Sequence, residues 1–265
     1  MKPHERIIIT GASSGIGRAL ALEYAARRAR MVLVARRERL LAEVADRVSA
    51  CGGEAVVLAA DAAERSTGQR ALKLAQERFG GVDVAIMNAG RRGSTPAATF
   101  DASIADDVMA VNYLSVCYML EAMLPAMRSA GGGTLVAIGS LAAYRGMPES
   151  GAYNASKAAL ATLMESLRTE LRHSGIHAIT IAPGFVRTEM TAPNQFRMPF
   201  LMEADEAARR IIRAIDRRRP VYRFPLGTSL VVRALQAMPV ALYDRLAARG
   251  YVRLRRERTC ERAHE

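Results

Sequence analysis

Two side chains near the middle of the chain have the types and spacing needed to move a proton. Tyr153 and Lys157 are four residues apart, a spacing that places both on one face of a helix. A phenol with a pKa of about 10 is a poor base at neutral pH, but a neighbouring ammonium group lowers that pKa. Tyr153 could then exchange a proton with a substrate oxygen. Such a pair also occurs by chance on helix surfaces, so it needs support from other residues.

Two further polar residues give that support. Ser140 follows an apolar run that ends at Ile138 and precedes Tyr153 by thirteen residues, so its hydroxyl could hold a carbonyl oxygen near the phenol. Asn112 stands in a helical stretch between apolar neighbours, an unfavourable place for asparagine unless its amide has a partner. The candidate catalytic residues are therefore Asn112, Ser140, Tyr153 and Lys157.

A glycine-rich turn follows the first apolar run of the chain, Ile7–Ile9, and opens a helical stretch. Glycines there would let the backbone pass close to a pyrophosphate, and the helix N-terminus would offer free N–H groups. Serine hydroxyls in the turn could add donors. A plain tight turn is the alternative, but the strand-turn-helix setting favours a nucleotide site. The turn comprises Thr10, Gly11, Ala12, Ser13, Ser14, Gly15, Ile16 and Gly17.

The residue that follows the second apolar run indicates which dinucleotide would bind. An acidic residue about 20 positions beyond such a turn would bind the 2′-hydroxyl of the adenosine ribose. Arg36 stands there instead, nineteen residues after Gly17. Because a guanidinium can pair with a 2′-phosphate, Arg36 predicts NADP(H) in preference to NAD(H). The alternatives are a solvated arginine, or Arg37 in the same role, although Arg37 is expected to face the helix.

Other candidate binding residues stand where apolar runs end. The Asp61 carboxylate could accept from an adenine amino group, cap a helix that begins at residue 63, or do both. Small residues at Asn88-Ala89-Gly90 would let the backbone approach a cofactor. The run that ends in Pro183-Gly184 is followed by Val186 and, four residues after Gly184, by Thr188.

The elements that must position these residues alternate along the chain. The expected strands are continuous apolar runs, which indicates that both faces of a parallel sheet are covered by helices. The predicted fold is therefore α/β, a doubly wound Rossmann sheet over residues 1–225 with a helical extension over 226–265. The expected strands are 7–9, 31–34, 55–58, 82–87, 134–138, 176–181 and 221–224, and the expected helices are 16–29, 37–50, 63–79, 101–129, 152–173 and 203–217.

Taken together, these motifs resemble the short-chain dehydrogenase/reductase family, in family order and spacing over about residues 5–190. The resemblance implies that Tyr153 is the acid/base and that Ser140 orients the substrate oxygen. Lys157 would lower the Tyr153 pKa and bind the nicotinamide ribose, and Asn112 would hold a water of the proton relay. The implied cofactor-binding residues are Gly11, Ser13, Ser14, Gly15, Ile16, Gly17, Arg36, Asp61, Asn88 on the adenosine side, Ala89, Gly90, Tyr153, Lys157, Pro183, Gly184, Val186 and Thr188 at the carboxamide.

The implied activity is hydride transfer between NADP(H) and a carbonyl or secondary alcohol, and Arg36 marks the NADP-preferring type. Apolar residues within 186–204, among them Met190, Phe196 and Phe200, suggest either a lid over a hydrophobic substrate or core packing beneath a loop. Two other functions stay open. The chain could be a catalytically silent NADP(H)-binding regulator, or it could act at a membrane surface through its basic tail.

The C-terminal extension departs from the family pattern, because many tetrameric members end soon after a seventh strand. Here apolar residues continue to Leu246, with arginines interleaved. The apolar face could pack on the domain or a sister subunit, or it could lie on an anionic membrane. Tetramer geometry is thus in doubt, while a homodimer or homotetramer is still expected. The arginines are residues 233, 245, 249, 253, 255, 256 and 258.

The amino-acid composition argues against several other kinds of partner and site. The net charge of +12 would suit nucleic acid, but the aromatic side chains on which bases stack make up only 5% of the residues and are scattered. We therefore expect no nucleic-acid partner. Three widely spaced cysteines predict neither disulfides nor a metal site. The N-terminus lacks the pattern of a signal peptide, and no stretch of 18 uncharged apolar residues predicts a membrane span. The expected location is the cytoplasm, with peripheral membrane contact left open.

Overall fold

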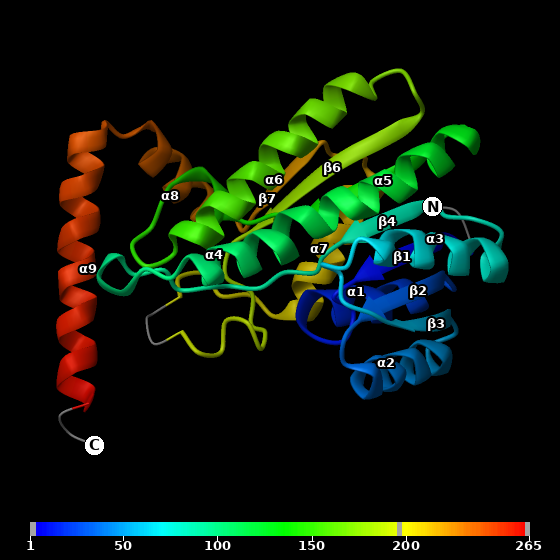
Figure 1. The fold of residues 1–265 in the computed structure, drawn as a ribbon, viewed down its shortest axis with the longest axis horizontal. Coiled ribbons are helices and arrows are strands. Elements are labelled where there is room, and N and C mark those ends of the chain that lie inside the picture. Colours follow the sequence, from blue (N-terminus) through cyan, green and yellow to red (C-terminus); the bar gives the residue numbers. More distant parts are fainter. Residues whose placement is uncertain (1–3, 195–197, 263–265) are drawn as a thin grey trace.

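Seven parallel strands form one sheet in the order β3-β2-β1-β4-β5-β6-β7 (Figure 1). This computed structural model describes residues 4–194 and 198–262, the last ten of them by their backbone alone. All seven expected strands are present, and each of their ends lies within two residues of the predicted one. They are β1 (Arg6–Thr10), β2 (Arg30–Ala35), β3 (Glu54–Ala59), β4 (Val84–Met87), β5 (Gly133–Ile138), β6 (Ile176–Pro183) and β7 (Val221–Phe224).

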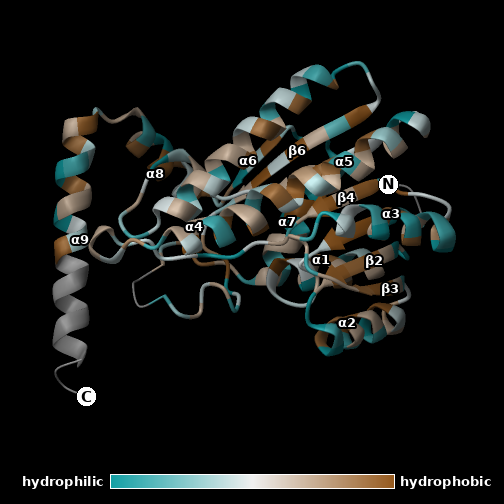
Figure 2. Cartoon of the chain, in the orientation of Figure 1, coloured by the Kyte–Doolittle hydropathy of each residue, from teal (hydrophilic) through white to brown (hydrophobic). Residues whose placement is uncertain are grey.

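Helices cover both faces of this sheet, which confirms the predicted doubly wound architecture. Alternate side chains of a strand point to opposite faces, so Ile7 and Ile9 of β1 join one core and Ile8 joins the other. The first core includes residues of α1 (Gly15–Ala25), α2 (Glu38–Ala50) and α7 (Ala204–Asp216). The second includes residues of α3 (Ser66–Phe79), α5 (Ser115–Ser129) and α6 (Gly151–Glu170). Figure 2 shows hydrophobic strands between these layers.

The helix expected over 101–129 is interrupted. It consists of α4 (Ala102–Met109), the π-helical turn η2 (Ala110–Leu114) and α5. The π-helical turn contains the buried Asn112, and such turns often occur at functional sites. By length and composition the whole stretch could cross a membrane, but 44% of its most apolar window is buried. Residues of α5 belong to the second core, so this segment is a core helix.

Helices α1 and α3 are each three residues shorter than the sequence predicts, and α6 ends at Glu170 and not at residue 173. Helix α1 ends at Ala25 and not at residue 29, because Arg28 adopts a left-handed conformation before β2 begins at Arg30. Helix α3 begins at Ser66 and not at residue 63, because residues 61–64 form a separate turn in which Glu64 N–H donates to the Asp61 carbonyl. None of these differences moves a strand.

Two helices follow β7. Helix α8 (Leu226–Ala237) packs against β7 and the short helix η3 (Leu141–Tyr144). Helix α9 (Val240–Arg262) stands at the edge of the molecule (Figure 1). Val240, Leu242 and Leu246 of α9 are exposed. The alternative in which the apolar residues of the tail pack on the domain is therefore wrong for these three side chains.

Candidate active site

A cleft of about 560 Å³ opens at the carboxyl ends of the strands, beside the point where the order of the strands reverses between β1 and β4. Ligands bind at such switch points in open α/β sheets. Of the predicted residues, only Gly17 and Asn112 do not line the cleft. Its lining includes Gly11, Ser13, Ser14, Gly15, Ile16, Arg36, Asp61, Asn88, Ala89, Gly90, Ser140, Tyr153, Lys157, Pro183, Gly184, Val186 and Thr188.

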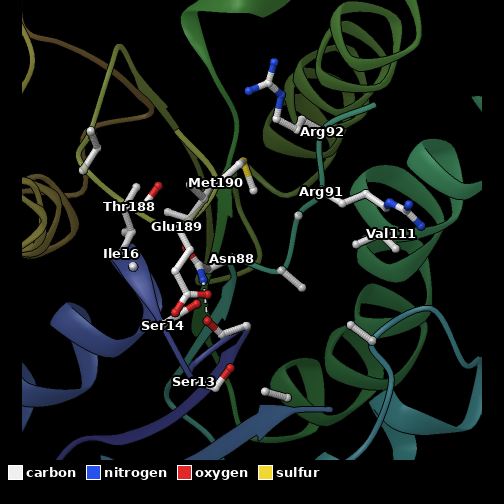
Figure 3. Close-up of a pocket in the computed structure, with 18 of the residues that line it drawn as sticks. Ser13, Ser14, Ile16, Asn88, Arg91, Arg92, Val111, Thr188, Glu189 and Met190 are labelled. Carbon is white, nitrogen blue, oxygen red and sulfur yellow. Dashed lines mark hydrogen bonds between the residues drawn. The ribbon is translucent and has the colours of Figure 1, made fainter. Parts of the chain in front are cut away.

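The glycine-rich turn forms one wall of the cleft, as Figure 3 shows for Ser13, Ser14 and Ile16. Gly11 and Gly15 have φ values of +66° and +52°, which side chains rarely adopt. Gly17 lies behind the turn, where an added Cβ would be 2.2 Å from the Gly11 carbonyl oxygen. The glycines therefore bring the backbone to the cleft and let α1 begin directly beneath it.

Asn88 fixes this turn from the neighbouring strand β4. Its Nδ2 donates to the carbonyl oxygens of Thr10 at 3.0 Å and Gly11 at 3.2 Å. The Thr10 hydroxyl in turn accepts from the backbone N–H groups of Asn88 and Ala89, both at 3.0 Å. Asn88 thus braces the turn in addition to lining the cleft, a role that its position at a strand end did not reveal.

Tyr153 and Ser140 come together at the cleft from different elements. Tyr153 is half-buried in the first turn of α6, and Ser140 precedes η3 just beyond β5. The Ser140 Oγ accepts from the Ala142 N–H at 3.1 Å, which orients the hydroxyl. Burial raises the pKa of the Tyr153 phenol, and hydrogen bonding with Ser140 and the charge of Arg92 oppose that rise.

Lys157 is buried one helical turn beyond Tyr153. Its Nζ donates to the Ile138 carbonyl at 2.8 Å and lies 5.9 Å from the centroid of the Tyr153 ring. Burial lowers the Lys157 pKa to about 8. Burial is thus the largest influence on the pKa of each group, because it disfavours the charged form of both, and the expectation that Lys157 lowers the Tyr153 pKa stays a prediction.

Asn112 reaches this group from the π-helical turn η2. Its Oδ1 accepts from the Arg91 N–H at 2.8 Å, and its Nδ2 donates to the Arg91 carbonyl and the Ser156 hydroxyl, both at 2.9 Å. The partner that the sequence required for this amide is therefore the backbone after Asn88-Ala89-Gly90. The side chain braces that segment against α6, and the water relay toward Lys157 stays a prediction.

Two arginines at the end of β2 face the cleft in different ways. The Arg36 side chain is 73% exposed, and its closest carboxylate, Asp61 Oδ2, is 3.6 Å away. Arg37 lies over the glycine-rich turn, where it donates to Ser14 Oγ at 2.7 Å and Ser13 Oγ at 3.3 Å. It also pairs with Glu189 at 2.8 Å. The expectation that Arg37 faces the helix is wrong.

Asp61 plays a different structural part from the one expected. Its Oδ1 accepts from the Ala63 N–H at 2.9 Å, which stabilises the turn at 61–64 and does not cap α3. Arg91 and Arg92 were not predicted, and they line the opposite side of the cleft from Ser13 and Ser14 (Figure 3). Their position directly after Asn88-Ala89-Gly90 was the available signal.

The segment expected to form a lid lies beside the cleft. Thr188 and Met190 line the cleft, whereas Met202 is buried and forms a β-bridge with Val186. Phe200 is exposed, and its ring lies against Gly227 of α8. Core packing is thus confirmed for Met202, the lid over a substrate stays a prediction, and Phe196 lies outside the described residues.

Comparisons with known proteins agree with this geometry. The profile of the short chain dehydrogenase family matches residues 5–197. An uncharacterized oxidoreductase of Myxococcus xanthus is 36% identical over 91% of this chain and 96% of its own length. A fatty acyl-CoA reductase of Mycobacterium tuberculosis is 34% identical over 88% of this chain and 80% of its own. A short chain dehydrogenase/reductase from Burkholderia phymatum, solved with NAD, has a TM-score of 0.82 at 25% identity and covers 88% of this chain and 94% of its own.

Proposed function

Because this chain belongs to the short-chain dehydrogenase family of nicotinamide-dependent oxidoreductases, we propose that it is an NADP(H)-dependent enzyme that interconverts a hydrophobic carbonyl compound and its alcohol. The observation that carries the proposal is that Ser140, Tyr153 and Lys157 line the same cleft as the glycine-rich turn. The cleft thus combines a dinucleotide-binding turn with an acid/base group. A catalytically silent regulator would have no use for the acid/base group.

The glycine-rich turn fits a dinucleotide. Residues Gly11 to Gly15 expose backbone and two serine hydroxyls to the cleft at the N-terminus of α1, where free N–H groups attract phosphate. The Cβ that Gly15 lacks would lie 3.0 Å from Thr188 Cγ2, so this approach needs glycine. When bound, the nicotinamide dinucleotide supplies or accepts the hydride at the substrate carbon.

The protein's own part in the reaction is to position the oxygen and move its proton. In the proposed mechanism the Ser140 and Tyr153 hydroxyls both donate hydrogen bonds to the substrate oxygen. During reduction Tyr153 gives its proton to that oxygen, and during oxidation it takes the proton back. Lys157, held by the Ile138 carbonyl, places a positive charge near the phenol and stabilises it when it is deprotonated.

The preference for NADP(H) rests on the end of β2. No acidic side chain stands there to accept from a ribose 2′-hydroxyl, and two arginines line the cleft instead. Arg36 is the better candidate for the 2′-phosphate because its guanidinium is exposed and only loosely paired. Arg37 is already engaged by Ser13, Ser14 and Glu189, and it lies over the turn that both dinucleotides would contact.

Two observations support the proposed substrate class. Met190 reaches the cleft from the 186–204 segment, where its thioether chain would suit an apolar substrate. A fatty acyl-CoA reductase is among the proteins similar to this chain over most of its length. We therefore expect lipid-like or other hydrophobic ketones, aldehydes or alcohols and not small polar sugars.

Turnover by a Tyr153→Phe variant tests the proposal. Hydrophobic carbonyl compounds and alcohols are screened with the wild-type enzyme by NADPH consumption or NADP+ reduction, and the variant is then assayed on an accepted substrate. Loss of the transferable proton should lower the rate at least ~100-fold, while NADPH still binds. Tyr222→Phe, which removes a phenol hydroxyl outside the cleft lining, is the control. Near wild-type turnover by Tyr153→Phe would overturn the assignment, and NADPH binding without any turnover would favour the regulator.

A further inference from the structure

The C-terminal helix α9 is attached to the rest of the protein at its first turns. The Arg145 guanidinium lies 4.1 Å from the centroid of the Tyr243 ring and donates to the Met238 carbonyl. The Tyr243 hydroxyl donates to the Gly146 carbonyl. Between residues 240 and 252, three side chains spaced four apart are half-buried, and the others are exposed. The half-buried ones are Tyr243, Ala247 and Tyr251. These contacts set the direction of α9 but leave most side chains of residues 240–252 uncovered.

The uncovered surface of α8 and α9 is rich in large aliphatic side chains. Leu226 is 71% exposed and Val240 is 67% exposed, although residues of this kind are usually buried. We call the set of these aliphatic residues the tail surface. An apolar surface of this kind marks an interaction site. The tail surface comprises Leu226, Leu230, Val231, Val240, Leu242 and Leu246.

Arginines on the same helices as the tail surface indicate the class of partner that would bind there. Arg233, Arg245 and Arg249 are exposed on the same two helices. Residues 226–262 hold eight arginines and three acidic residues, a net charge of +5. A second copy of the chain would bring the same positive charge against its own, which disfavours self-association here. A lipid surface with anionic headgroups complements both the charge and the aliphatic side chains.

We propose that α8 and α9 bind the protein peripherally to an anionic phospholipid surface, with the aliphatic side chains of the tail surface among the lipids and the arginines at the headgroups. The position of α8 would bring the lipid contact close to the substrate. Helix α8 packs on η3, which begins just after Ser140, and Gly227 lies against Phe200 of the 186–204 segment. The lipid contact would therefore lie on the substrate side of the cleft. The binding itself does not depend on the reaction proposed above.

Vesicle co-sedimentation of the full chain tests this proposal. The protein is mixed with vesicles of phosphatidylcholine alone, or with vesicles that also contain phosphatidylglycerol, at low and at high salt. We expect binding to the anionic vesicles only, and weaker binding at high salt because exposed charges are screened. Arg245→Glu/Arg249→Glu should weaken binding by more than about 30-fold, since each arginine near such a surface contributes about fivefold and each new carboxylate is repelled by the anionic headgroups. Leu242→Ser/Leu246→Ser should weaken it as well.

The matched control carries the same change in charge at the opposite end of the molecule. Arg39→Glu/Lys73→Glu lies on α2 and α3, which are remote from α9 in Figure 1, and should bind vesicles almost as the wild type does. NADPH titration shows that each variant is folded. Absence of binding to anionic vesicles would overturn the proposal, and so would equal loss in both charge variants. A dimer that dissociates in Leu242→Ser/Leu246→Ser without any lipid binding would assign the tail surface to a second copy instead.

Discussion

Replacing Arg36 and Arg37 one at a time should separate recognition of the 2′-phosphate from recognition of the dinucleotide as a whole. The Arg36 guanidinium is mostly exposed, and its ion pair within the described part of the chain is the 3.6 Å contact with Asp61, so it can turn toward a phosphate without losing a strong bond. A charge-assisted hydrogen bond contributes about 1.5–3 kcal/mol. Arg36→Ala should therefore weaken NADPH about 10- to 150-fold and leave NADH nearly unchanged.

Arg37→Ala should behave differently because Arg37 contacts the turn that both cofactors would use. It donates to the Ser13 and Ser14 hydroxyls, so its loss should weaken NADPH and NADH by similar factors. Arg39→Ala is the control, since Arg39 is highly exposed, pairs with Glu43 and does not line the cleft.

Fluorescence titration of each variant with NADPH and NADH measures both effects. Alanine is preferable to aspartate at position 36, because a new carboxylate beside Asp61 would add repulsion that has nothing to do with the cofactor. Equal weakening of the two cofactors by Arg36→Ala would refute the assignment. A loss confined to NADPH in Arg37→Ala, with Arg36→Ala unchanged, would transfer the phosphate contact to Arg37.

Three further predictions concern the turn, the buried lysine and the tail. Gly17→Ala should abolish NADPH binding and lower the free energy of unfolding by about 1–3 kcal/mol, because the added Cβ would meet the Gly11 carbonyl. Gly146→Ala, whose added Cβ would meet open space, is the control. NADPH titration measures the binding and calorimetry measures the stability. The lowered Lys157 pKa should make the cofactor-free protein more stable as pH rises from about 8 toward 10, and Lys157→Met should remove that rise in denaturant titrations. Truncation after Phe224 should leave NADPH binding but cause association in light scattering, because it uncovers surface of β7 and η3; a monodisperse product with unchanged turnover on large ketones would contradict this.

The sequence predicted the sheet more accurately than the site contacts, for physical reasons. Continuous apolar runs such as Met31–Val34 fit few structures other than a buried strand. The backbone angles of a glycine-rich turn can be adopted by few residues other than glycine. Side-chain partners depend on where separate elements meet in space. Asn112 needed a partner, but nothing in the sequence identified it as the backbone of Arg91, twenty-one residues away. Likewise, the sequence placed Arg36 ahead of Arg37 as the phosphate ligand, but it could not show that Arg37 lies over the glycine-rich turn and contacts Ser13 and Ser14.

The pKa values of Tyr153 and Lys157 have a consequence for the direction of proton transfer. Burial raises the Tyr153 pKa, so the phenol is protonated at neutral pH, the form that donates to a carbonyl oxygen during reduction. Beside an oxidised, positively charged nicotinamide ring, Tyr153 would lose its proton more readily, because a positive charge close to a buried group favours the phenolate. Tyr153 would thus be an acid when the reduced cofactor is bound and a base when the oxidised cofactor is bound. In the proposed mechanism the redox state of the bound cofactor, and not Lys157 alone, would therefore set the role of Tyr153 in each direction.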